Sequence, residues 1–178
     1  MCIRDSLTQV PLGFETGRQA IIRLILSGPR YASAAQVRGY ADDVLARVRA
    51  VPGVADAEAA SSAPLESGPL AWFVVTDRPR PPAGEESRAI LRTAGPGYTR
   101  ALGIPIRRGR AFTAADADGA PKVAIVNETM ARTVFAGEDP IGRTLDISPR
   151  TRTPWAERLG RVTIIGVCLL YTSPSPRD

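Results

Sequence analysis

One amphipathic segment, flanked by two short apolar runs, constrains this chain more than any other feature. Over residues 34–51 the apolar side chains fall three or four positions apart, which is the spacing of one helix face. Ser33 stands where a helix N-cap belongs, and Pro52-Gly53 ends the pattern. Residues 21–26 and 54–60 are short runs typical of strands. We therefore predict a strand–helix–strand unit over 21–60, which favours parallel strands with the helix on one face.

The rest of the chain predicts further short strands and little helix. Apolar or alternating runs, bounded by Gly, Pro or polar residues, predict strands at 72–76, 87–93, 104–110, 123–126, 144–147 and 162–167. Helical turns are predicted at 98–102, and a helix capped by Asn127 runs to about Phe135. A lone strand–helix–strand unit leaves much apolar surface exposed. We therefore expect the apolar strand 162–167 to join a sheet with 21–26 and 54–60.

Composition excludes several kinds of catalytic site. The chain has 178 residues, a net charge of +5 and no histidine, so no His base, His triad or His metal ligand exists. Of the 23 basic residues only Lys122 is a lysine. Four arginines cluster within eleven residues, at Arg100, Arg107, Arg108 and Arg110. No aromatic platform is interleaved with them, so we predict a strand with one polar face and no nucleic-acid site.

Three further motifs are better explained by local structure than by chemistry. Asp116-Ala117-Asp118-Gly119 has part of a calcium-loop pattern, but the first and twelfth positions would be Ala114 and Ile125, which cannot be ligands. Gly95-Pro96-Gly97 lacks the lysine and helix of a phosphate loop and is predicted to break a strand. Asn127 begins a glycosylation sequon, yet its position favours a helix cap. We predict no catalytic, cofactor-binding or metal-binding residue.

The two ends of the chain differ in style from the rest. Reverse translation of residues 1–6 and 168–178 is consistent with one inverted repeat that resembles a translated sequencing adapter, so we predict two tails without packed contacts, apart from an extension of the final strand. Both cysteines, Cys2 and Cys168, lie in these tails, and a disulfide between them is not expected. We expect residues 7–167 to be an internal piece of a longer protein.

Eight segments in order carry a resemblance to a known family. They are Arg49-Ala50-Val51-Pro52-Gly53-Val54, Ala63-Pro64-Leu65, Ala94-Gly95-Pro96-Gly97-Tyr98, Leu102-Gly103-Ile104-Pro105, Arg108-Gly109-Arg110-Ala111-Phe112, Val123-Ala124-Ile125-Val126-Asn127-Glu128-Thr129-Met130-Ala131, Gly137-Glu138-Asp139-Pro140-Ile141-Gly142-Arg143 and Thr163-Ile164-Ile165-Gly166-Val167. This series resembles the MacB-like periplasmic core domain of FtsX-type ABC transporter permeases over about 11–167. The resemblance implies an α+β fold with two lobes. Residues 7–69 and 148–167 would form a strand–helix–strand lobe, and 70–147 an inserted mixed α/β lobe.

The resemblance also implies a non-enzymatic role in transport. The parent would be an inner-membrane permease with this domain on its periplasmic side, where it couples cytoplasmic ATP hydrolysis to conformational change in export or efflux. Its partners would be a cytoplasmic ABC ATPase, a second permease subunit and a periplasmic adaptor, with no cofactor and no nucleic acid. Two alternatives are a free-standing periplasmic binding module and a hydrolytic enzyme. Membrane helices encoded on either side of 7–167 would favour the permease. A stop codon soon after Val167 would favour the free-standing binding module.

Overall fold

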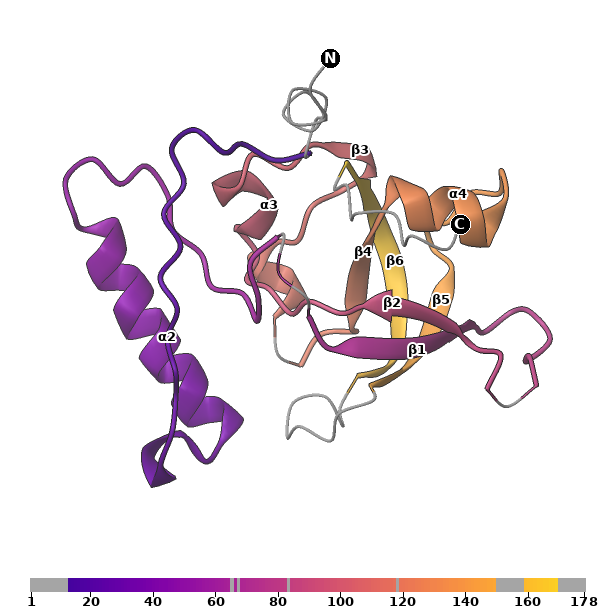
Figure 1. Ribbon diagram of the computed structural model, residues 1–178, viewed down its shortest axis with the longest axis horizontal. Helices are drawn as coiled ribbons and strands as arrows, with labels where there is room; N and C mark the ends of the chain where they lie inside the picture. Colours follow the sequence, from indigo (N-terminus) through magenta and orange to yellow (C-terminus); the bar gives the residue numbers. More distant parts are fainter. Residues whose placement is uncertain are drawn as a thin grey trace, which may run out of the picture.

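A curled six-stranded sheet forms the body of the protein, and one long helix stands beside it (Figure 1). The computed structural model describes residues 13–64, 66, 68–82, 84–117, 119–149 and 159–169. The strands are β1 (Leu70–Val75), β2 (Ser87–Ile90), β3 (Ile106–Gly109), β4 (Val123–Asn127), β5 (Thr144–Pro149) and β6 (Gly160–Cys168). The helices are η1 (Pro29–Tyr31), α2 (Ala34–Arg49), α3 (Tyr98–Ala101), η2 (Ala114–Asp116) and α4 (Glu128–Phe135). The fold is therefore mixed α/β, as predicted.

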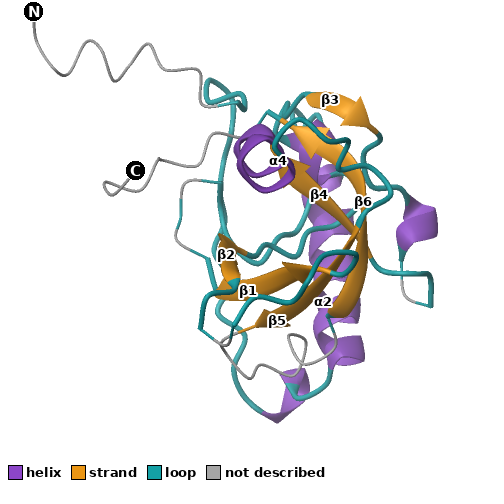
Figure 2. Ribbon diagram, turned by 90° about the vertical axis from the view of Figure 1, so that its right-hand side faces the viewer, coloured by secondary structure: helices purple, strands orange, loops and turns teal. Residues whose placement is uncertain are grey.

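Strand β6 organises the sheet. Its first residues pair antiparallel with β5, its last three pair antiparallel with β3, and β4 runs parallel to it from residue 163 onward. The sheet continues from β5 through β1 to β2, which is an edge of the order β2-β1-β5-β6-β3. Figure 2 shows β6 curving from the β1–β5 pair toward β3 and β4. The chain thus builds one sheet around its last described strand.

The core lies between the sheet and α4. Strand β1 alternates half-buried and buried residues, so that Ala71, Phe73 and Val75 share one buried face. Phe135, the last residue of α4, and Ile164 in β6 are both 0% exposed. They belong to one cluster with residues of β1, β4 and β5. This continuous apolar cluster holds the sheet and α4 together.

Helix α2 has the predicted ends but not the predicted packing. The Ser33 hydroxyl accepts the Gln36 backbone N–H at 3.2 Å, and the Gln36 side chain accepts the Ser33 N–H, which forms a capping box. None of the α2 side chains that the structure describes is buried. The helix lies to one side of the sheet, with the preceding extended segment running along it (Figure 1). The helix is therefore held by its ends more than by a core.

The predicted strands on either side of α2 are wrong. Residues 21–26 are extended without strand pairing, and 54–60 contribute one isolated bridge, between Ala60 and Ala94. The predicted pairing of 162–167 with these segments is also wrong, because β6 pairs with β3, β4 and β5. Strand β5 reaches β6 across a short connection, and such local pairing costs less loop entropy than pairing across a hundred residues. The division of the chain into two lobes stays a prediction.

The predicted tails fall largely outside the described residues. Residues 1–6 and 170–178 are not among them, so the predicted absence of contacts there, and the rejected pairing of Cys2, stay predictions. Cys168 and Leu169 continue β6: Cys168 is 7% exposed and pairs with Ile106, and the Leu169 N–H donates to the Pro105 carbonyl at 3.0 Å. Along the part of the chain that the structure describes, no helix has the length and apolar composition of a membrane span.

Candidate functional site

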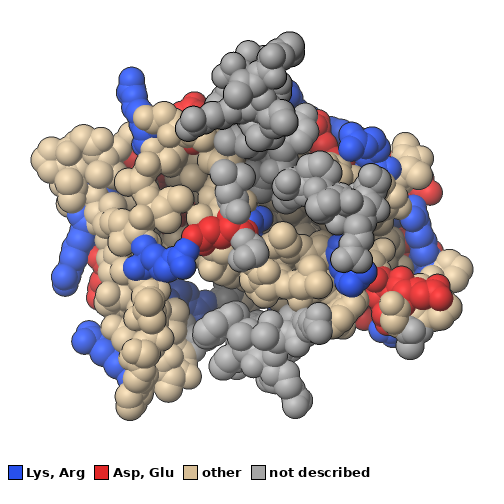
Figure 3. All heavy atoms as spheres, in the orientation of Figure 1, with Lys and Arg blue, Asp and Glu red and all other residues tan. Residues whose placement is uncertain are grey.

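The clustered arginines point to separate acidic partners. Arg107 lies 3.8 Å from a carboxylate oxygen of Glu128, and Arg108 lies 2.6 Å from one of Asp139. Strand β3 lies at an edge of the sheet and does not show the predicted alternation, because Arg107 and Arg108 are both exposed and a register shift separates Ile106 from Arg108. On the face shown in Figure 3, basic side chains are scattered, with acidic ones near several of them. The arginines therefore do not converge on one anion, and the geometry gives no support to a nucleic-acid site.

Arg110 and Asp116 form a pair joined by two hydrogen bonds. Two guanidinium nitrogens of Arg110 donate to the two carboxylate oxygens of Asp116, each at 2.7 Å, and the Thr113 N–H donates to the same carboxylate at 2.7 Å. The bonds from Arg110, followed by that from Thr113, hold the pKa of Asp116 far below its usual range. Asp116 is thus committed to Arg110 and to capping η2. Among the described residues, no group of three or more Cys, Asp or Glu is placed to hold a metal ion.

Asn127 acts as the predicted helix cap. Its side-chain oxygen accepts the Met130 backbone N–H at 2.8 Å, at the point where β4 passes directly into α4. This contact satisfies one of the backbone donors that a helix N-terminus leaves without an intrahelical partner. The structure therefore assigns Asn127 a local structural role.

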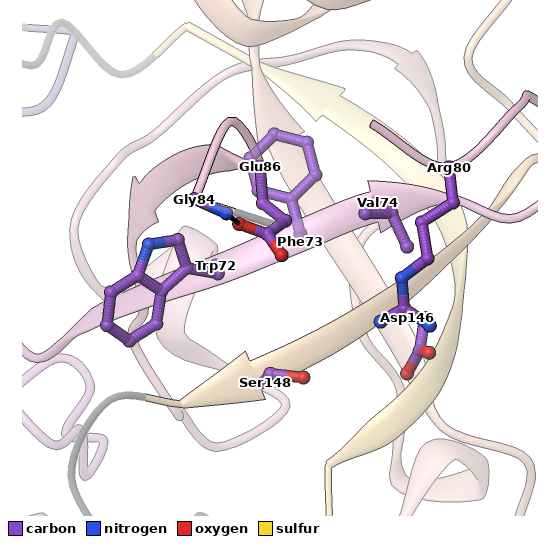
Figure 4. A pocket seen from close by; sticks show the side chains of 8 residues that line it. All are labelled: Trp72, Phe73, Val74, Arg80, Gly84, Glu86, Asp146 and Ser148. Carbon is purple, nitrogen blue, oxygen red and sulfur yellow. Dashed lines mark hydrogen bonds between the residues drawn. The ribbon is translucent and has the colours of Figure 1, made fainter. Parts of the chain in front are cut away.

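A shallow cavity of about 330 Å³ lies on the outer face of β1 and β5 (Figure 4). The strands contribute Trp72, Val74, Asp146 and Ser148, and the connector after β1 contributes Arg80 and Glu86. Backbone N–H groups of Glu86 itself and of Gly84 lower the pKa of the Glu86 carboxyl, with Gly84 donating at 2.8 Å. The cavity thus carries charges of both signs.

The cavity is lined by one hydroxyl and by two acidic side chains, Glu86 and Asp146. Its hydroxyl belongs to Ser148, and its nearest acid along the strand is Asp146, two residues away. The Cα atoms of residues two apart on a strand stand about 7 Å from each other, and their side chains share one face of the sheet. No sequence argument singled out these residues, because a cavity made by a folded-over connector leaves no periodic signal.

A second feature joins the α2 region to the sheet. We call it the junction and define it as residues 56–61 together with 93–103. Its backbone is paired twice: the Ser61 N–H donates to the Thr93 carbonyl at 2.8 Å, and the Gly95 N–H donates to the Ala59 carbonyl at 2.9 Å. Asp56 accepts the Arg100 Nε–H at 2.7 Å, and this bond lowers the pKa of Asp56. The junction therefore combines strand-like pairing with an ion pair.

Glu58 occupies the centre of the junction. Its side chain is 7% exposed, and its carboxylate accepts the Gly97 N–H at 2.8 Å. An Arg49 guanidinium nitrogen, at the C-terminal end of α2, lies 3.7 Å from the same oxygen. A Cβ at position 95 would stand 2.2 Å from the other carboxylate oxygen, so the glycine permits this close approach.

From sequence, Gly95-Pro96-Gly97 was predicted only to break a strand, and Glu58 was not singled out. A signal was present, because Asp56 and Glu58 alternate with alanines in 54–60 and so place two acids on one side of an extended segment. A segment of small residues, such as Gly95 and Gly97, has room for two acidic side chains that pack against it. Which distant segment lies opposite is a tertiary fact that no local pattern carries.

Comparisons with known proteins place the chain in a family. The family model of the MacB-like periplasmic core domain matches residues 3–177, a range that includes parts of both predicted tails. Among solved structures, the periplasmic region of MacB from Actinobacillus actinomycetemcomitans is similar, with 17% identity, a TM-score of 0.48, and coverage of 72% of this chain and 50% of that one. The extracellular domain of the noncanonic ABC-type transporter YknZ from Gram-positive bacteria is also similar, with 18% identity, a TM-score of 0.44, and coverage of 72% and 56%.

This chain thus spans about half the length of the solved structures it matches. No curated protein sequence matches it. The family model covers nearly the whole chain, and the structure has the mixed α/β character expected of the resemblance. The chain belongs to the family of MacB-like periplasmic core domains.

Proposed function

We propose that this domain is the extracytoplasmic part of an ABC transporter permease and that its role is mechanical. It stands on the periplasmic side of the inner membrane and changes position as a cytoplasmic ATPase hydrolyses ATP, in support of export or efflux. The family assignment supports the location. The ATPase, a second permease subunit and a periplasmic adaptor are the partners that such a role requires.

One observation carries the mechanical role: α2 stands beside the sheet, and the junction ties the two together. A helix buried in a core moves with that core, whereas one held by its ends moves as a separate unit. The sequence also contains no His, and the described residues contain no group of three or more Cys, Asp or Glu that could hold a metal ion. These features favour transmission of movement over bond chemistry.

The proposed location is tested with the parent gene. The parent is expressed with Ala46→Cys, an exposed position on α2, in a background without other cysteines. A membrane-impermeant maleimide is then added to intact spheroplasts. We expect labelling without lysis and co-purification with the membrane fraction. Thr133→Cys on α4 serves as the matched second site and should label equally. Labelling only after lysis would overturn the location.

The proposed coupling is tested in the purified transporter. Crosslinking α2 to the sheet should lower ATP turnover by the complex, and reduction of the crosslink should restore it. Unchanged turnover in a fully crosslinked sample would contradict the mechanical role. A free-standing binding module remains the second candidate because of the cavity at Trp72. A parent gene that lacks membrane helices would favour it.

A further inference from the structure

The attachment of α2 depends on polar contacts at its C-terminal end. Arg49, the last residue of the helix, donates from Nε and Nη2 to the Ala57 carbonyl at 3.1 and 2.7 Å. The same guanidinium faces Glu58 at 3.7 Å. No described α2 side chain is buried, so these polar contacts, and not apolar packing, attach the helix to the rest of the protein. The end of the helix is thus fixed to the segment that contains Glu58.

A continuous path leads from Glu58 to the centre of the sheet. The Gly97 N–H that Glu58 accepts lies directly before α3. After α3 the Ile104 N–H donates to the Thr99 carbonyl at 2.8 Å, and both of these residues are buried. Strand β3 begins two residues later and pairs with β6. Arg49 is therefore connected to β6 through Glu58, Gly97 and α3.

We propose that Glu58 is the latch of this path: with its carboxylate on Gly97 the α2 unit is locked to the sheet, and without that contact the unit is released. This deepens the proposed function by naming the residue through which movement passes. The Ala59 N–H donates to the other carboxylate oxygen at 3.0 Å, so release of Gly97 leaves only the oxygen that faces Arg49 without a backbone donor. A buried acceptor that loses its donor carries a desolvation cost, which disfavours intermediate positions of the contact. Gly95 and Gly97 belong to the latch, since a Cβ at either position would meet the Glu58 carboxylate at 2.2 or 2.8 Å.

The latch is tested in the 178-residue chain with Glu58→Ala and Glu58→Gln. The alanine variant removes the acceptor, and the glutamine variant keeps an acceptor but loses the charge that faces Arg49. Hydrogen exchange is followed by mass spectrometry in peptides from 93–103, 34–49 and β6. For Glu58→Ala we expect exchange in the first two to accelerate by roughly tenfold or more, with β6 unchanged. The glutamine variant should fall between wild type and alanine.

A distance measurement separates a latch from a merely stabilising contact. Spin labels at Ala46→Cys on α2 and Thr133→Cys on α4, with Cys2 and Cys168 replaced by alanine, report the distance between α2 and the α4 side of the sheet. Wild type should give one narrow distribution, and Glu58→Ala a broad or two-peaked one at an unchanged unfolding midpoint of the sheet. If the alanine variant does not fold, Glu58→Gln and Arg49→Gln should each broaden the distribution.

Glu66→Gln is the matched control. Glu66 forms an ion pair with Arg23 and so joins the extended segment before α2 to the loop before β1, but both side chains are well exposed. An exposed pair contributes little, so this variant should leave exchange and distances as in wild type. The latch is refuted if Glu58→Ala leaves both readouts unchanged, or if Glu66→Gln has an equal effect. Because the chain holds no ATPase, these outcomes are independent of whether the parent couples ATP hydrolysis to movement.

Discussion

Truncation of Phe135 is the sharpest test of the core. Phe135→Ala removes a ring that is 0% exposed and that packs where α4 meets the sheet. Removing a buried phenylalanine side chain costs about 3–5 kcal/mol. The Arg78 guanidinium lies 5.5 Å from the ring centroid, and loss of this cation–π contact adds about 0.5–1 kcal/mol. For a chain of this size, each kcal/mol lowers the melting temperature by about 2–4 °C, so we expect a fall of roughly 7–24 °C.

Urea unfolding followed by circular dichroism measures this loss, and the slope m should stay constant while the midpoint falls. Phe135→Leu keeps an apolar side chain and should lose roughly a third as much free energy. Ile90→Ala is the control, because Ile90 lies on edge strand β2 and is 41% exposed, so its loss should stay within about 1 kcal/mol. A loss below about 1 kcal/mol for Phe135→Ala would refute the assigned core.

Three other predictions rest on single contacts. In Gly109→Ala the new Cβ would stand 2.2 Å from the Ile165 carbonyl oxygen at a φ of +72°, so unfolding free energy should fall by more than about 2 kcal/mol. The control Gly137→Ala, at φ +94° with open space, should lose about 1 kcal/mol in the same urea titration. Because the Asp116 pKa is lowered in the fold, its stabilising contribution is present above the unfolded pKa near 3.8 and is lost as pH falls below it. The gap in urea midpoint between wild type and Asp116→Asn should therefore be constant near neutral pH, begin to narrow near pH 4 and narrow further toward the much lower folded pKa, and a gap that does not narrow on acidification would contradict this. Asn127→Ala should cost about 1 kcal/mol through loss of the α4 cap, whereas Asn127→Asp should cost little; equal midpoints for wild type and alanine would exclude the cap.

Local patterns predicted local structure well. The spacing of apolar residues and the Ser33 and Asn127 caps placed α2 and α4 correctly, because capping and helix periodicity act within a few residues. The strands at 123–127 and 160–168 were also placed correctly, since runs of Val and Ile mark them. Such elements depend on side chains near in sequence, which a single chain displays directly.

Strand pairing and the junction depend on distant residues and were not predictable in the same way. Residues 21–26 have the composition of a strand, but a strand exists only where a partner offers backbone groups, and the described residues offer none there. The apolar pattern of 162–167 predicted a strand in a sheet, but it did not indicate which strands would pair with it. Glu58 and Gly97 are 39 positions apart, and their contact follows from the path of the chain around Pro96.

The extended segment before α2 has a consequence for how this domain behaves once it is made. Ile21, Ile22 and Ile25 are 66%, 68% and 86% exposed, and full burial of one such side chain is worth about 1.5–3 kcal/mol. Their exposed fractions together represent about 3–7 kcal/mol of unrealised burial, which is close to the whole stability of a marginally stable domain. Exposed, extended apolar segments of this kind promote aggregation and bind holdase chaperones. We expect the isolated chain to remain dispersed only at low concentration, and its solubility to rise when Ile25 alone is changed to lysine.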